Sequence, residues 1–155
     1  RRLCWIRTVS TTPMTIKTYL GFDVGTKRTG VAIANSLTSQ ANGIDTVIHN
    51  KDGSTNWRDL EDIIKQHDPN AFIVGLPLDK DNKEQEMTFI AKSFGRKLEE
   101  RFNINVFFID EYLSSSEAKN QLKWHYAHKN ADRGDVDKRS AELILQTWLN
   151  ETTHD

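Results

Sequence analysis

Acidic residues stand at three places where predicted secondary-structure elements meet a sheet. Asp23 lies within an apolar strand, Asp110-Glu111 follows a second strand, and Asp137 begins a predicted helix. Carboxylate oxygens hold Mg²⁺ or Mn²⁺ well, and a pair of such ions activates water and stabilises the leaving oxygen in phosphoryl transfer. If these acids converge, they predict a two-metal site that hydrolyses phosphodiester bonds.

Each acid also has a simpler interpretation. A carboxylate buried in mid-strand is costly unless it binds a cation or is hydrogen-bonded, but Asp23 at a strand end would cap the following turn. Asp137 at a helix start stands where an N-cap is found. The Asp110-Glu111 pair also fits a solvated strand exit. Residue types alone leave these alternatives open, and only the coincidence of all three favours the metal site.

The elements that would position these acids follow from the hydrophobic pattern. Apolar β-formers on both sides of a turn between Gly25 and Gly30 predict a hairpin, with glycines that can take positive φ. Further strands are predicted at residues 44–49, 71–76 and 106–109, the last two as buried strands. Helical stripes are predicted at Trp57, Leu60, Ile63 and Ile64, at Met87, Ile90, Ala91, Phe94, Leu98 and Phe102, and at Ala141, Ile144, Leu145, Trp148 and Leu149.

This order predicts an α/β fold. Short connections favour antiparallel pairing of the first three strands, and the later strands add in parallel through right-handed crossovers. The result is a mixed five-stranded sheet with helices on both faces. In such a fold the carboxyl ends of the parallel strands gather functional groups.

Composition limits the class of protein. The 155 residues carry 21 basic and 22 acidic side chains, so the whole-molecule charge does not indicate a nucleic-acid binder. The single cysteine, Cys4, excludes an internal disulfide and a Cys-rich zinc site, and no apolar run is long enough to span a bilayer. We expect a cytoplasmic protein with one domain at residues 14–150 and a tail at 151–155. Residues 1–13 are predicted to be a disordered appendage, either an upstream translated piece, an expression remnant or a targeting segment.

Four motifs together resemble a known family. They are Phe22-Asp23-Val24-Gly25-Thr26-Lys27 with Gly30-Val31-Ala32, then Ile73-Val74-Gly75-Leu76-Pro77-Leu78, then Asp110-Glu111 with Leu113-Ser114, and Val136-Asp137 with Ala141 and Leu145. In this order they resemble the YqgF family of RNase-H-like Holliday-junction resolvases, also described as pre-16S rRNA nucleases. The resemblance covers nearly all of residues 16–150.

The resemblance implies an RNase-H-like fold and a nuclease dependent on Mg²⁺ or Mn²⁺. Asp23, Glu111 and Asp137 then match the catalytic, metal-binding acids, with Asp110 as the alternative to Glu111. The chain departs from the family at Tyr112, where Arg is usual and one phosphate contact is lost.

Local basic clusters supply the expected nucleic-acid contacts. Lys27 and Arg28 lie in the first turn, and four further cations lie near Asp137: Lys129, Arg133, Lys138 and Arg139. Phosphate backbones are bound by such charges, although each one alone also fits a solvated surface. The predicted partner is an rRNA precursor or branched DNA, not a membrane, and the protein is expected as a monomer or weak homodimer.

The residues and the resemblance together predict a metal-dependent endonuclease of structured nucleic acid, and the resemblance implies processing of the pre-16S rRNA 5′ end in ribosome biogenesis as its function. One alternative is a Holliday junction resolvase, which needs two symmetric sites and hence a dimer. The other is a catalytically silent RNA- or protein-binding module. Retention of all three acids argues against that module, because binding alone does not need a repulsive carboxylate cluster.

Overall fold

A computed structural model describes residues 15–78, 86–110 and 133–152 of the chain. The predicted appendage at residues 1–13 lies outside the described residues. The elements are β1 (Thr18–Val24), β2 (Arg28–Asn35), β3 (Asn42–Ile48), α2 (Trp57–His67), β4 (Ala71–Leu76), α3 (Glu86–Phe102), β5 (Asn105–Asp110) and α5 (Arg133–Thr152). Helix α5 continues to Thr152, so the stretch predicted as a tail begins within a helix. No helix among the described residues is long and apolar enough to cross a membrane.

The strands form one mixed sheet in the order β3-β2-β1-β4-β5. β1 pairs antiparallel with β2, and β2 pairs antiparallel with β3, whereas β4 pairs in parallel with both β1 and β5. The predicted mixed sheet with three antiparallel first strands is therefore confirmed. Because β1, β4 and β5 run in the same direction, their carboxyl ends lie at the same end of the sheet.

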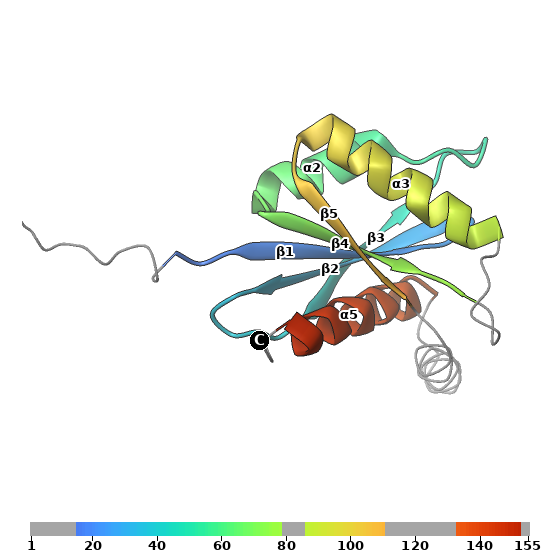
Figure 1. The fold of residues 1–155 in the computed structure, drawn as a ribbon. Helices are drawn as coiled ribbons and strands as arrows, with labels where there is room; N and C mark the ends of the chain where they lie inside the picture. The colour runs from blue at the N-terminus through green and yellow to red at the C-terminus, as the bar shows by residue number, and fades with distance from the viewer. Residues whose placement is uncertain (1–14, 79–85, 111–132, 153–155) are drawn as a thin grey trace, which may run out of the picture.

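Helices cover both faces of the sheet: α2 and α3 lie over one face, and α5 lies over the other (Figure 1). We call these the α2/α3 face and the α5 face. Asn56 caps α2, since its side chain accepts a hydrogen bond from the Asp59 N–H at 3.2 Å. The chain leaves α2 through Asp68, whose φ of 46° is left-handed.

The α2/α3 face holds the main hydrophobic core. Phe22, Phe72 and Leu98 are fully buried there, and Phe22 makes ring contacts with Phe72 at 5.7 Å and Phe94 at 5.4 Å between centroids. Alternation along β1 sends Leu20, Phe22 and Val24 to this face. These large side chains carry most of the apolar burial of the fold.

The α5 face is built differently, from aliphatic residues without aromatic rings in its buried core and with glycines that let the helix approach the strands. Its core consists of Ala32, Ala34, Ala41, Ile73, Ile109, Ala141, Ile144, Leu145 and Leu149. A Cβ on Gly30 would lie 2.0 Å from the backbone oxygen of Asp137, and one on Gly43 would lie 2.6 Å from that of Lys138. Glycine is therefore required at both positions by the closeness of α5.

Four expectations from the sequence are corrected. β5 is not a buried strand: it is the sheet edge, and Phe107 and Phe108 are 44% and 40% exposed. Ile90 is 40% exposed because the buried stripe of α3 runs through Thr88, Ala91, Phe94, Gly95 and Leu98.

Asp137 does not begin its helix, since α5 starts at Arg133. Gly25 and Gly30 do not need positive φ, which among the described glycines occurs at Gly53.

Candidate active site

Asp23 lies on the α5 face, near the carboxyl end of β1. Two residues before it on the same face, a Cβ on Gly21 would meet Leu145 of α5, and Tyr19 contacts Trp148 with ring centroids 5.0 Å apart. Because side chains alternate along a strand, Asp23 shares this face and Phe22 takes the other. Asp23 is half-buried and pairs in register with Gly30 of β2.

Asp137, on α5, also lies next to Gly30. It lies in the second turn of α5, and a Cβ on Gly30 would be 3.2 Å from its Cβ. Asp23 and Asp137 thus lie on one face of the sheet, next to the same glycine. The interpretation of Asp137 as an N-cap is excluded, because the helix begins four residues earlier.

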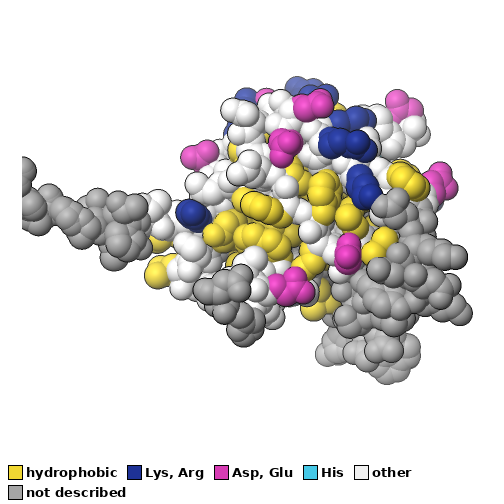
Figure 2. Space-filling view, viewed as in Figure 1, with side chains coloured by type: hydrophobic (Ala, Val, Ile, Leu, Met, Phe, Trp, Pro, Cys, Tyr) yellow, Lys and Arg dark blue, Asp and Glu magenta, His cyan; other side chains and the backbone are white. Residues whose placement is uncertain are grey.

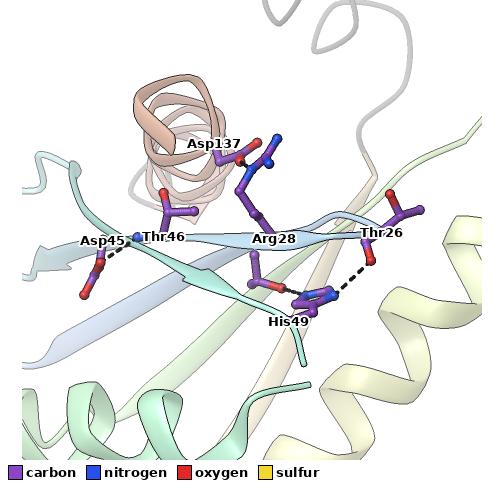
Figure 3. A network of polar contacts seen from close by, with 7 residues as sticks. Thr26, Arg28, Asp45, Thr46, His49 and Asp137 are labelled. Atoms are coloured by element: carbon purple, nitrogen blue, oxygen red, sulfur yellow. Dashed lines mark hydrogen bonds and ion pairs between the residues drawn. The ribbon is translucent and has the colours of Figure 1, made fainter. Parts of the chain in front are cut away.

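Arg28 pairs with Asp137, a contact that the sequence did not predict. Its Nε donates to Asp137 Oδ2 at 2.7 Å, and the two side chains are 28% and 24% exposed (Figure 3). The backbone of Arg28 is fixed because its carbonyl accepts from the Gly25 N–H at 2.8 Å, closing the β1–β2 turn. The guanidinium therefore holds the Asp137 carboxylate in one orientation.

His49 stabilises this turn by hydrogen bonds, from the side of β2 opposite Asp137 (Figure 3). Its backbone N–H donates to the Lys27 carbonyl at 2.9 Å, and its Nδ1 lies 3.1 Å from the Thr26 carbonyl. Since a carbonyl only accepts, Nδ1 carries a proton, and in the neutral ring Nε2 accepts from the buried Thr29 hydroxyl at 2.8 Å. No spacing signal in the sequence marks these contacts.

Of the acidic pair Asp110-Glu111, the structure describes Asp110, which is the last residue of β5. Asp110 pairs in parallel register with Leu76, which belongs to the α2/α3 core, whereas Ile109 belongs to the α5 core. Asp110 therefore lies on the face opposite Asp23 and Asp137. Glu111, the preferred third acid, lies outside the described residues.

The predicted nucleic-acid contacts fall in different surroundings. Lys27 is exposed at the β1–β2 turn, and Lys138 is half-buried, with its backbone over Gly43 of β3. Arg139 pairs with Glu142 at 2.9 Å. Arg133 is the first residue of α5, and Lys129 lies outside the described residues.

The carboxylates of Asp23 and Asp137 are suitable ligands for a divalent cation, but they make up only part of the set of ligands that such an ion needs. Mg²⁺ is commonly held by one or two carboxylates together with water and substrate phosphates, and Asp23 and Asp137 supply such oxygens from two elements that cannot easily separate. Within residues 15–78, 86–110 and 133–152, no group of three or more His, Cys, Asp or Glu is placed to hold a metal.

Comparison with known proteins gives consistent results. The family model described as "RuvX: Holliday junction resolvase" matches residues 17–151. A "Putative pre-16S rRNA nuclease" of Aeromonas salmonicida is 42% identical over 138 residues, covering 89% of this chain and 98% of the relative. A protein of the same name from Saccharophagus degradans is 43% identical over 136 residues, covering 87% and 94%.

Solved structures share the fold at low sequence identity. Thermus thermophilus RuvC in complex with a Holliday junction substrate has a TM-score of 0.54 and 13% identity, covering 88% of this chain and 96% of that one. The fowlpox virus resolvase in complex with Holliday junction DNA has a TM-score of 0.56 and 14% identity, covering 87% and 98%. The sheet and its helices are therefore those of the resolvase, RNase-H-like fold.

Proposed function

The chain belongs to the RuvX (YqgF) family of Holliday junction resolvases, and from this premise we propose that it is a metal-dependent endonuclease of structured nucleic acid. It is a hydrolase acting on phosphodiester bonds, as its nuclease relatives are. We assign catalysis and metal binding to Asp23, Glu111 and Asp137.

The observation that carries this proposal is the meeting of Asp23 and Asp137 at Gly30. Because Gly30 carries no side chain, α5 packs close to the sheet there, and this supports a site in which Asp137 and Asp23 act together from one face. Asp110 is directed to the α2/α3 face, away from Asp23 and Asp137, and this supports Glu111 rather than Asp110 as the third ligand.

The residues of this chain have separable roles in the proposed reaction. A divalent cation held by the three acids would supply an activated water and stabilise the leaving oxygen. Arg28 keeps the Asp137 carboxylate oriented through its Nε. Lys27, exposed at the same turn, binds a phosphate of the substrate backbone, and Lys129, Arg133, Lys138 and Arg139 extend that contact.

The proposed substrate is the 5′ end of pre-16S rRNA, processed in the cytoplasm during ribosome biogenesis. It is supported by relatives that carry this name at about two-fifths identity over nearly their whole length. The second candidate is a four-way DNA junction, supported by the family description and by the junction complexes that share the fold. Cleavage of an rRNA precursor and of a four-way junction by the same preparation, each with Mg²⁺, separates the two.

The central test is Asp23→Asn. This change removes a metal ligand but leaves shape and volume intact, so cleavage is expected to fall at least about 1,000-fold while the melting temperature holds. Binding of the substrate should persist through Lys27 and the other cations. Thermal unfolding, fluorescence anisotropy and Mg²⁺-dependent cleavage are measured on one protein.

Asp45→Asn is the matched control. Asp45 is an exposed strand carboxylate that accepts the Thr46 N–H at 2.7 Å, and the Asn oxygen accepts the same bond. We expect it to cleave like the wild type. An Asp23→Asn protein that melts earlier yet still cuts would show that Asp23 is structural, and the proposed site would be wrong.

A further inference from the structure

A groove of about 480 Å³ lies on the other side of the β1–β2 turn from Asp137. Its walls are the turn itself, the loop after β3, the start of α2 and the first three turns of α3. We call it the α3 groove. Its position at the carboxyl end of β1 places it beside the candidate active site, on the α2/α3 face.

Aromatic and apolar side chains form its floor and one wall. Trp57 and Phe94 stack with centroids 5.7 Å apart and an interplanar angle of 13°. Phe89 and Ile90, in the first two turns of α3, are 56% and 40% exposed. Exposed large apolar side chains that gather in a hollow indicate a binding surface.

The remainder of the rim is polar and has a basic side. The hydroxyls of Ser54, Thr55 and Ser93 line the groove together with Lys97, and Glu86 is its one acidic lining residue among those described. Between residues 87 and 98, α3 carries Lys92, Arg96 and Lys97 and no acid. Figure 2 shows Lys and Arg side chains gathered over α3 beside hydrophobic ones.

The β1–β2 turn joins the groove to the candidate active site. Gly25 and Thr26 line the groove, while Arg28, at the end of the same turn, reaches Asp137 on the α5 face. His49 also lines the groove and bonds to the turn on both sides of Lys27. A nucleic-acid strand that passes over Lys27 from the carboxylates therefore enters the groove.

We propose that the α3 groove holds an unpaired nucleotide of the substrate, with its base against Phe89 and its phosphate near Lys97. This inference rests on the proposed function and adds a requirement for a single-stranded segment beside the cleavage site. Aromatic faces that stack bases and cations that follow the backbone are what single-stranded nucleic acid requires. A protein partner would favour an interface centre depleted of charge, which the cations of α3 do not provide.

The test compares two RNA hairpins without divalent metal, so that binding is measured and cleavage does not occur. One hairpin is blunt, and the other carries an unpaired oligouridine tail at each end. The wild type should bind the tailed hairpin more tightly, and Phe89→Ala should remove about 10-fold or more of that affinity. Affinity for the blunt hairpin should be unchanged.

Leu37→Ala is the matched control, since Leu37 is 73% exposed on the loop between β2 and β3 and is not part of the groove. It should leave both affinities unchanged. Lys97→Gln should weaken tailed-hairpin binding and lower its salt dependence, because one phosphate contact is lost.

Two results overturn the proposal. One is equal binding of both hairpins, or of the tailed hairpin by wild type and Phe89→Ala. The other is a wild-type dimer in sedimentation that Phe89→Ala converts to a monomer, because the groove would then be an interface between two copies. Neither result depends on cleavage, so the groove and the assignment of Asp23 succeed or fail separately.

Discussion

The two faces of the sheet are built from different residues for different purposes. The α2/α3 face packs large side chains such as Phe22, Phe72 and Leu98 into one continuous core. On the α5 face the helix packs closely against the sheet, because Gly30 and Gly43 lie directly beneath the helix backbone. One face packs the larger side chains, and the other brings the Asp137 backbone close to Gly30, the register partner of Asp23.

Neighbouring residues of β1 show the division most clearly. Phe22 is fully buried on one face, and Asp23 is half-buried on the other. A sheet that is covered on both sides can thus hold a polar site without weakening its main core. The variants below test this separation from the largest expected effect on stability to the smallest.

Phe22→Ala should cause the largest loss of stability. Removing a fully buried ring leaves a cavity between Phe72 and Phe94, and the free energy of unfolding should fall by about 4 kcal/mol. Urea denaturation measures the loss, with Phe22→Leu as a control that should cost less than about 1.5 kcal/mol. A small effect of Phe22→Ala would mean that the core of the fold lies elsewhere.

Gly30→Ala should have an intermediate effect on stability and a large one on cleavage. Its Cβ would meet the Asp137 backbone at 2.0 Å, so α5 must shift, at a cost of about 1–3 kcal/mol. Displacement of the Asp137 carboxylate by about 1 Å should lower cleavage by about 100-fold. Denaturation and Mg²⁺-dependent cleavage are measured together.

Gly95→Ala is the control on the opposite face. The added Cβ would lie 2.5 Å from the end of the Phe108 side chain, which is 40% exposed and can move away, and 3.2 Å from a methyl group of Val106, which must give slightly. Helix propensity then favours Ala over Gly by up to about 1 kcal/mol, so stability should change little and cleavage not at all. Equal effects of the two substitutions would show that closeness at Gly30 has no special importance.

The Arg28–Asp137 pair should contribute least to stability. Both side chains are about one-quarter exposed, so a double-mutant cycle of Arg28→Gln and Asp137→Asn should give a coupling of about 1 kcal/mol or less at low salt. The coupling should weaken as salt rises. The more exposed Arg139–Glu142 pair serves as the reference and should couple more weakly. A coupling of zero would mean that helix packing alone orients Asp137.

Sequence patterns were sufficient for the sheet and for most of the core. The apolar run around Asp23 predicted the strand β1, and the stripe from Ala141 to Leu149 identified the sheet side of α5. The prediction that β5 is buried was wrong, because a short apolar run has the same sequence pattern at the edge of a sheet as at its centre.

Local sequence patterns could not predict the contacts within the candidate active site. Arg28 and Asp137 are separated by 109 positions, and nothing near either residue indicates the other. His49 lies outside any metal-ligand spacing, so its bonds to Thr26 and Thr29 emerge only when β3 pairs beside β2. The exposure of Ile90 depends on how α3 rotates against the sheet, which periodicity fixes only to within part of a turn.

The distance along the chain between β1 and α5 also bears on when the protein becomes active. Synthesis on a ribosome releases the chain from its N-terminus, so Asp23 emerges long before Asp137. The sheet can assemble its α2/α3 core while residues 133–152 are still being made. A nascent chain then holds one of the proposed ligands without the other, so the proposed assignment predicts that nuclease activity begins only when α5 docks over Gly30.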